Sequence, residues 1–107
     1  MTITHQRERF TDFIAEARPL IARHFAEVDQ FLVSTGVADE ATYEGIEEAG
    51  LLRLYTAREA GRLVGYASFL VRAAAHCANS LHAAHDTLYL VPEARKGMAG
   101  IRFIAWC

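Results

Sequence analysis

The stretch from Leu88 to Gly100 constrains the fold of this chain more than any other part of the sequence. A short apolar run, Leu88 to Val91, ends at Pro92, and a basic turn containing Gly97 and Gly100 follows it. The apolar residues after this turn predict a helix. A strand, a small-residue turn and a helix start together present free backbone N–H groups and the positive end of a helix dipole to an anion. We therefore expect an anion-binding turn here.

The length and composition indicate one ordinary globular domain that spans residues 1–107. Hydrophobic residues make up 52% of the chain and charged residues 22%, which argues against a disordered protein. A formal net charge of −2 gives no electrostatic attraction for nucleic acid. No apolar run approaches the roughly 20 residues of a membrane span, and the N-terminus lacks the apolar segment of a signal peptide. We expect a cytoplasmic protein without nucleic-acid or membrane partners.

Two helices are predicted in the first half of the chain. Apolar residues recur at spacings of three and four from about Arg7 to Leu32, which is typical of an amphipathic helix. Pro19 interrupts this pattern, so we expect a kink or two abutting helices. An acidic segment then predicts a short helix that Asp39 caps and that ends before Gly50.

The pattern changes to a period of two from Leu51, which predicts a β-hairpin. The first strand ends near Glu59, Ala60 and Gly61 form a tight turn, and the second strand covers Arg62–Val71. Gly65 lies inside the second strand and indicates a bulge or a close approach of another backbone.

The segment from Arg72 to Ala84 is expected to be a connecting loop or a weak turn of helix, and a strand follows from His85 or Asp86 to Val91. Four residues near this loop could ligate a metal, but their spacing matches no zinc site: His76, Cys77, His82 and His85. We therefore expect solvent-facing imidazoles and no metal. The two cysteines, Cys77 and Cys107, are expected to be free thiols.

The predicted elements give an α/β (α+β) fold, in which helices pack on a mostly antiparallel sheet of three to four strands. In this order they resemble the GNAT superfamily of N-acetyltransferases, whose acetyl-coenzyme A (acetyl-CoA) signature is a strand, an R-x-x-G-x-G turn and a helix. The resemblance covers residues 7 to 107 and is carried by Glu47-x-x-Gly50, Gly61 to Ala67 (GRLVGYA), Asp86-x-Leu88-Tyr89 and Arg95 to Gly100. His76 and Ser80-Leu81-x-Ala83 resemble small GNAT-like proteins of phages and prophages.

The resemblance implies acetyl-CoA as the cofactor. The strand of Leu88 and Leu90 would pair with the pantetheine arm, and the turn would wrap the pyrophosphate with Arg95, Lys96, Gly97, Met98, Ala99 and Gly100. Small residues are needed in such a turn because a Cβ would hold the phosphate oxygens away. Met98 departs from the family pattern, which usually has a small residue there. The alternative is a plain strand-to-helix connection with a glycine cap.

Acetyl transfer to an amine requires a group that accepts a proton. Asp86 is the best candidate for this base, and strand alternation predicts that it shares a face with Leu88. Its alternative role is a turn or cap residue at the strand start. His76 and His85 are weaker candidates, and Tyr89 is expected in the core.

Compared with complete GNAT domains, the chain is expected to be a C-terminally shortened, N-terminal half of the fold. Leu88 to Val91 would then be an unpaired sheet edge, and the apolar helix Ala99 to Cys107 would have little to pack on. We expect a homodimer or a protein partner to cover this edge and helix. Two functions stay open: an acetyl-CoA-dependent N-acetyltransferase, or a non-catalytic binding module such as a phage-encoded, anti-CRISPR-like inhibitor of a host defence enzyme.

Overall fold

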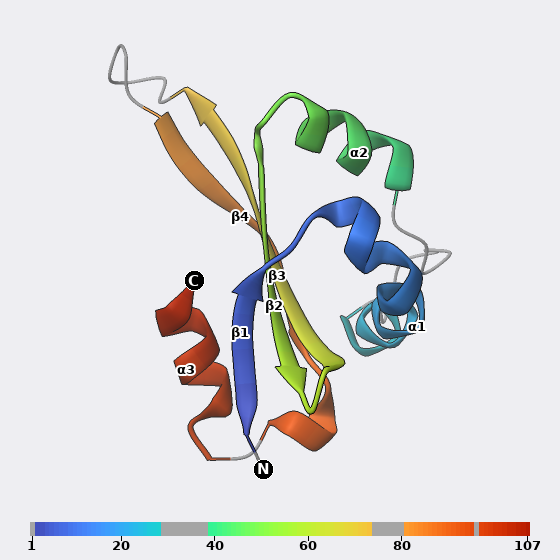
Figure 1. Ribbon diagram of the computed structural model, residues 1–107, viewed down its shortest axis with the longest axis vertical. Helices are drawn as coiled ribbons and strands as arrows, with labels where there is room; N and C mark the ends of the chain where they lie inside the picture. Colours follow the sequence, from blue (N-terminus) through green and yellow to red (C-terminus); the bar gives the residue numbers. More distant parts are fainter. Residues whose placement is uncertain (1, 29–38, 74–80, 96) are drawn as a thin grey trace.

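The computed structural model describes residues 2–28, 39–73, 81–95 and 97–107 (Figure 1). Four strands and three α-helices follow one another, with one short 3-10 helix, η1, before the last: β1 (Ile3–Arg7), α1 (Phe10–Val28), α2 (Glu40–Glu48), β2 (Leu52–Glu59), β3 (Arg62–Ala73), β4 (Leu81–Leu90), η1 (Pro92–Ala94) and α3 (Ala99–Trp106).

The four strands form one sheet in the order β1-β2-β3-β4, and each neighbouring pair is antiparallel. Helices α1 and α2 lie on one side of this sheet and α3 lies on the other, beside β1 (Figure 1). This arrangement confirms the expected α/β fold with helices packed on an antiparallel sheet. In the described part of the chain, β4 is an edge strand paired only with β3. The partner expected across this edge stays a prediction.

The N-terminal strand β1 was not predicted, because the helical spacing of apolar residues begins at about Arg7, the last residue of β1. Only Ile3 and His5 face inward in β1, and one of the two is polar, so the alternation is weak. Of the two alternatives expected at Pro19, the one with two abutting helices is wrong, since α1 continues through Pro19 as one helix. Pro19 lies on the exposed side of α1, where water can satisfy the carbonyl that loses its partner. Residues 29–32 of the predicted helix lie outside the described residues.

The acidic helix and the hairpin are confirmed. Asp39 caps α2 by accepting a hydrogen bond from the Thr42 N–H at 3.1 Å, and Gly50 takes a positive φ of 76° after the helix ends. Ala60 and Gly61 both have positive φ, 52° and 81°, so the two-residue turn has the twist that antiparallel strands require.

Gly65 marks both a bulge and a close approach, as its place in the strand predicted. The β2–β3 register shifts between Ala57, opposite Gly65, and Arg58. A Cβ added at Gly65 would lie 2.6 Å from the carbonyl oxygen of Tyr89 and 2.7 Å from the Leu90 Cδ1. The backbones of β3 and β4 therefore meet here at a distance that only glycine permits.

The predicted loop between β3 and β4 is too long at both ends. Strand β3 continues to Ala73, and β4 begins at Leu81, whose Cα pairs with that of Ala73. The alanines of this region have low strand propensity, so the sequence did not predict that the strands extend into it. The extension is instead stabilised by the pairing between β3 and β4. His82 is thus a strand residue and not a loop residue, while His76 and Cys77 lie outside the described residues.

The hydrophobic core lies between the sheet and α1, with a smaller contribution from α3. On the α1 side the helix buries Phe10, Phe13, Ile14, Ala17 and Ile21. On the other side Phe103 is 1% exposed, and its ring stacks on His5 with 5.4 Å between centroids. Among the described residues, no helix is long and apolar enough to cross a membrane.

An ion-pair cluster joins the start of α1 to the hairpin. The Arg58 guanidinium donates two hydrogen bonds to Glu8, at 2.8 and 2.9 Å, and a third to Glu16 at 2.8 Å. The Glu8 and Arg58 side chains are only 10% and 14% exposed. Glu8 also accepts a hydrogen bond from the Thr56 hydroxyl. These hydrogen bonds, with Arg58 contributing most, lower the pKa of Glu8 to about 2.

Candidate functional site

Asp86 occupies a β-bulge in β4. Ser68 of β3 lies opposite Thr87 and Phe69 lies opposite His85, so Asp86 is the extra residue between them. The bulge interrupts the alternation of side chains and turns the carboxylate toward α2. It accepts hydrogen bonds from the Ser68 hydroxyl at 2.8 Å and from the Tyr43 hydroxyl. The prediction that Asp86 shares a face with Leu88 is therefore wrong.

The hydroxyl groups around Asp86 form a connected set on the α2 side of the sheet. Ser68 and Thr87 face each other with 2.7 Å between their oxygens, and the Tyr43 ring stacks on Phe10 at 5.2 Å. Burial raises the pKa of the Tyr43 hydroxyl, and its hydrogen bond to Asp86 raises it further. Tyr43 therefore stays protonated at neutral pH and acts as a donor to the carboxylate.

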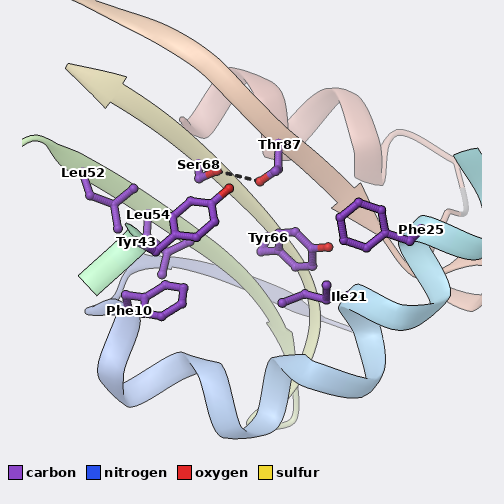
Figure 2. A pocket seen from close by; sticks show the side chains of 9 residues that line it. All are labelled: Phe10, Ile21, Phe25, Tyr43, Leu52, Leu54, Tyr66, Ser68 and Thr87. Atoms are coloured by element: carbon purple, nitrogen blue, oxygen red, sulfur yellow. Dashed lines mark hydrogen bonds between the residues drawn. The ribbon is translucent and has the colours of Figure 1, made fainter. Parts of the chain in front are cut away.

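A small cavity of about 50 Å³ lies beside this set, between the sheet and the two helices α1 and α2 (Figure 2). Its wall is mostly apolar, with the hydroxyls of Ser68 and Thr87 at one end: Phe10, Ile21, Phe25, Tyr43, Leu52, Leu54, Tyr66, Ser68 and Thr87. The Tyr66 hydroxyl lies 2.8 Å from His24 Nδ1, and burial lowers the pKa of this imidazole. Asp86 is exposed and does not line the cavity, but its carboxylate is hydrogen-bonded to Ser68, which does.

A larger groove of about 300 Å³ lies on the opposite face of β4. It brings together four of the eight residues that the resemblance assigns to the cofactor, namely Leu88, Leu90, Arg95 and Gly100, with Phe103 and Ile104 of α3. Met98 and Ala99 line a neighbouring hollow instead, together with His5 of β1. Lys96 lies outside the described residues.

The turn between β4 and α3 has two glycines with different local roles. Gly97 has a φ of 56°, a left-handed conformation that favours glycine over residues with a side chain. Gly100 lies in the first turn of α3, and a Cβ added there would meet no protein atom within 4 Å. Neither backbone strain nor packing requires glycine at position 100. An external group therefore has room to approach the first turn of α3 beside Gly100.

Arg95 lines the groove but is not a free positive charge. Its Nε donates to the Leu90 carbonyl at 2.6 Å, and its other two nitrogens pair with the Glu27 carboxylate at 2.9 Å each. The guanidinium also lies 5.4 Å from the centroid of the Tyr89 ring. Arg95 therefore fixes the end of β4 against α1. Its predicted contact with the cofactor stays a prediction.

Sequence reasoning missed Tyr43, Ser68 and Glu27. Ser68 gave a weak signal, because it is a small polar residue in an otherwise apolar strand. Tyr43 and Glu27 gave none, since each meets its partner from a distant helix. Within the described part of the chain, no three His, Cys, Asp or Glu residues gather into a possible metal site.

No protein-family model matches this chain, and no curated protein matches it either. Several solved structures are similar. The ribosomal-protein-alanine N-acetyltransferase from Brucella melitensis biovar Abortus 2308 is 17% identical, with a TM-score of 0.75 over 99% of this chain and 69% of that chain. A predicted acetyltransferase with acetyl-CoA from Clostridium acetobutylicum is 9% identical, with a TM-score of 0.75 over 98% and 70% of the two chains.

The glucosamine-6-phosphate N-acetyltransferase from Arabidopsis thaliana is also similar, at 13% identity and a TM-score of 0.70 over 99% of this chain and 71% of that chain. These structural neighbours are acetyltransferases, and the chain has the GNAT-like fold that its sequence predicted. Identities this low show the fold alone. None of the three supports the alternative of a phage-encoded inhibitor.

Proposed function

We propose that this chain transfers an acetyl group from acetyl-CoA to a primary amine. One observation carries the proposal: β4 holds the groove lined by Leu88 and Leu90 on one face and the Asp86 carboxylate on the other. Asp86 and Leu88 are two residues apart, so the two sites meet at the exposed edge of the same strand. The similarity in fold to N-acetyltransferases adds support.

The groove suits the chemistry of coenzyme A. Leu88, Leu90 and Ile104 offer an apolar wall for the pantetheine arm, and among the described residues no further strand pairs with the outer side of β4. The open space at Gly100 would admit the pyrophosphate to the N–H groups at the start of α3. Bound acetyl-CoA would supply a thioester, whose acetyl group the amine receives.

Asp86 would act as the base for this reaction. An amine is protonated near neutral pH and must lose a proton before it can act as a nucleophile. The carboxylate accepts that proton, while the hydroxyls of Ser68 and Tyr43 hold it in one orientation.

The test is a transfer assay with the full chain, acetyl-CoA and a panel of primary amines. Free coenzyme A is measured by its thiol, and the acetylated amine is identified by mass spectrometry. We expect equal amounts of thiol and acetylated amine. Thiol release without an acetylated product, or no release with any amine, would refute the proposed function.

A further inference from the structure

We infer that the cavity beneath α1 and α2 is the amine-binding site, and that it selects a monoamine carried on a short apolar chain. This inference rests on the proposed function, since it names the acceptor of that reaction. Its basis is the shape and lining of the cavity and the charge at one end.

The size of the cavity limits what can enter it. A water molecule needs roughly 10–15 Å³ of such space, so about 50 Å³ admits only a few atoms. A sugar ring or a peptide side chain of aromatic size does not fit. A linear chain of a few carbons does.

The wall of the cavity favours apolar groups of a ligand over polar ones. Phe10, Leu52, Leu54 and Ile21 are all buried core residues. The hydroxyls of Ser68 and Thr87 contact each other at one end (Figure 2), while the Tyr66 hydroxyl points elsewhere and is already paired with His24. A ligand with one polar end and an apolar tail matches this division.

The charge at the polar end matches one ammonium group. In the described part of the chain, Asp86 is bonded to two hydroxyls and to no arginine or lysine. The Tyr43 ring, whose hydroxyl bonds to Asp86, lies beside it and adds attraction for a cation. An ammonium group at this end would therefore balance the carboxylate.

Three carboxylates on α1 and α2 already have partners. Glu40 pairs with Arg18 at 2.8 Å and Glu27 pairs with Arg95 at 2.9 Å. Glu47 accepts a hydrogen bond from the Phe10 N–H at 2.6 Å. A second ammonium group on the ligand would enter an apolar space without a counter-charge, which costs free energy. The cavity therefore disfavours diamines and polyamines.

A direct binding experiment tests this without acetyl-CoA. The full chain is titrated with methylamine, ethylamine, propylamine and butylamine, and binding is followed by NMR shifts of the Ser68 and Thr87 amides. Each added methylene is expected to raise the binding constant about three- to fourfold until the cavity is full. Putrescine is the matched control ligand, because it replaces the terminal methyl of pentylamine by a second ammonium group. We expect it to bind at least tenfold more weakly than pentylamine, which is titrated alongside it.

A variant tests whether the amine binds in this cavity. Phe25 is half-buried at one end of the cavity, and Phe25→Ala is expected to shift the preference toward longer amines such as hexylamine. Leu20→Ala is the matched control, since Leu20 is also half-buried on α1 but does not line the cavity. It should leave the preference unchanged.

The outcomes separate this inference from the proposed function. Binding with the expected chain-length dependence, but without acetyl transfer, would support the site and refute the enzyme. Transfer with equal or better use of putrescine would support the enzyme and overturn the site. No amine binding at tens of millimolar, or shifts confined to other residues, would also overturn the site.

Discussion

The hydroxyl of Ser68 donates a hydrogen bond of 2.8 Å to the carboxylate of Asp86, from the strand next to it in the sheet. Thr87 lies opposite Ser68, and both side chains face α1 and α2. Asp86 directly precedes Thr87, so regular alternation would have placed its side chain on the other face of the sheet. The bulge at Asp86 brings the Ser68 and Asp86 side chains together. It thereby places a charged group next to the Ser68 end of an apolar cavity, opposite the groove of Leu88 and Leu90.

The first prediction concerns Asp86. Asp86→Asn keeps the shape and the hydrogen bond from Ser68 but cannot accept a proton, so the rate of acetyl transfer should fall by roughly 10²- to 10⁴-fold. The affinity for acetyl-CoA should not change, because Asp86 lies on the other face of β4. Asp12→Asn, on the exposed side of α1, is the control and should keep full activity. A rate for Asp86→Asn equal to that of the unaltered chain would remove Asp86 from the mechanism.

The second prediction compares two helical glycines. A Cβ meets no protein atom at either Gly45 of α2 or Gly100 of α3. Both substitutions to alanine should therefore raise the free energy of unfolding, each by up to about 1 kcal/mol, because alanine favours helix. Only Gly100→Ala should weaken acetyl-CoA binding. Urea unfolding and calorimetry measure the two effects, and equal acetyl-CoA affinity in both variants would contradict the role of Gly100.

The third prediction concerns the close approach at Gly65. Gly65→Ala places a methyl group 2.6 Å from the Tyr89 carbonyl oxygen, which is backbone and cannot turn away. We expect a loss of about 2–3 kcal/mol in the free energy of unfolding, as for other overpacked sites. Urea unfolding measures it. If Gly65→Ala lowers the free energy of unfolding by less than an ordinary surface substitution does, the close approach of β3 and β4 at Gly65 is contradicted.

The fourth prediction concerns pH. The folded-state pKa of Glu8 is lowered to about 2, from 4.5, chiefly by hydrogen bonds from Arg58. A carboxylate with a lowered pKa contributes stability above its unfolded value and loses it as pH falls toward the folded value. Glu8→Gln should therefore cost about 2 kcal/mol at pH 7, and the cost should shrink as pH falls from 4.5 to 2.

This pH dependence is measured by urea unfolding at a series of pH values. Glu59→Gln is the control, since it changes a carboxylate at the end of β2, outside the cluster of Arg58 with Glu8 and Glu16. A difference between Glu8→Gln and the unaltered chain that stays constant from pH 7 to pH 2 would contradict the lowered pKa.

Much of the fold followed from local patterns. The period of two around Ala60 and Gly61 predicted β2 and β3, and the caps at Asp39 and Gly50 bounded α2. Strand β1 was not predicted because its inward-facing residues include the polar His5. The ring of His5 stacks on Phe103, which is far away in the sequence. Its pairing with β2 spans about 50 residues of sequence, and no local pattern reports such a partner.

Only part of the candidate site was predicted from the sequence, for a related reason. The turn at Gly97 and Gly100 is local, and the structure brings Leu88, Leu90, Arg95 and Gly100 to one groove. The face of Asp86 depends on a bulge, which arises from the register between β3 and β4 and not from the residues near Asp86 alone. The pairing of Arg95 with Glu27 likewise joins β4 to α1 across the fold.

Isothermal titration calorimetry of the full chain with acetyl-CoA tests the central claim most directly. The groove and the open turn at Gly100 predict one site with an affinity in the micromolar range, which Gly100→Trp abolishes by filling the space above α3. Gly45→Trp on the exposed side of α2 serves as the control and should bind normally. Absence of heat at millimolar acetyl-CoA, or unchanged binding by Gly100→Trp, would contradict the claim that this groove binds the cofactor.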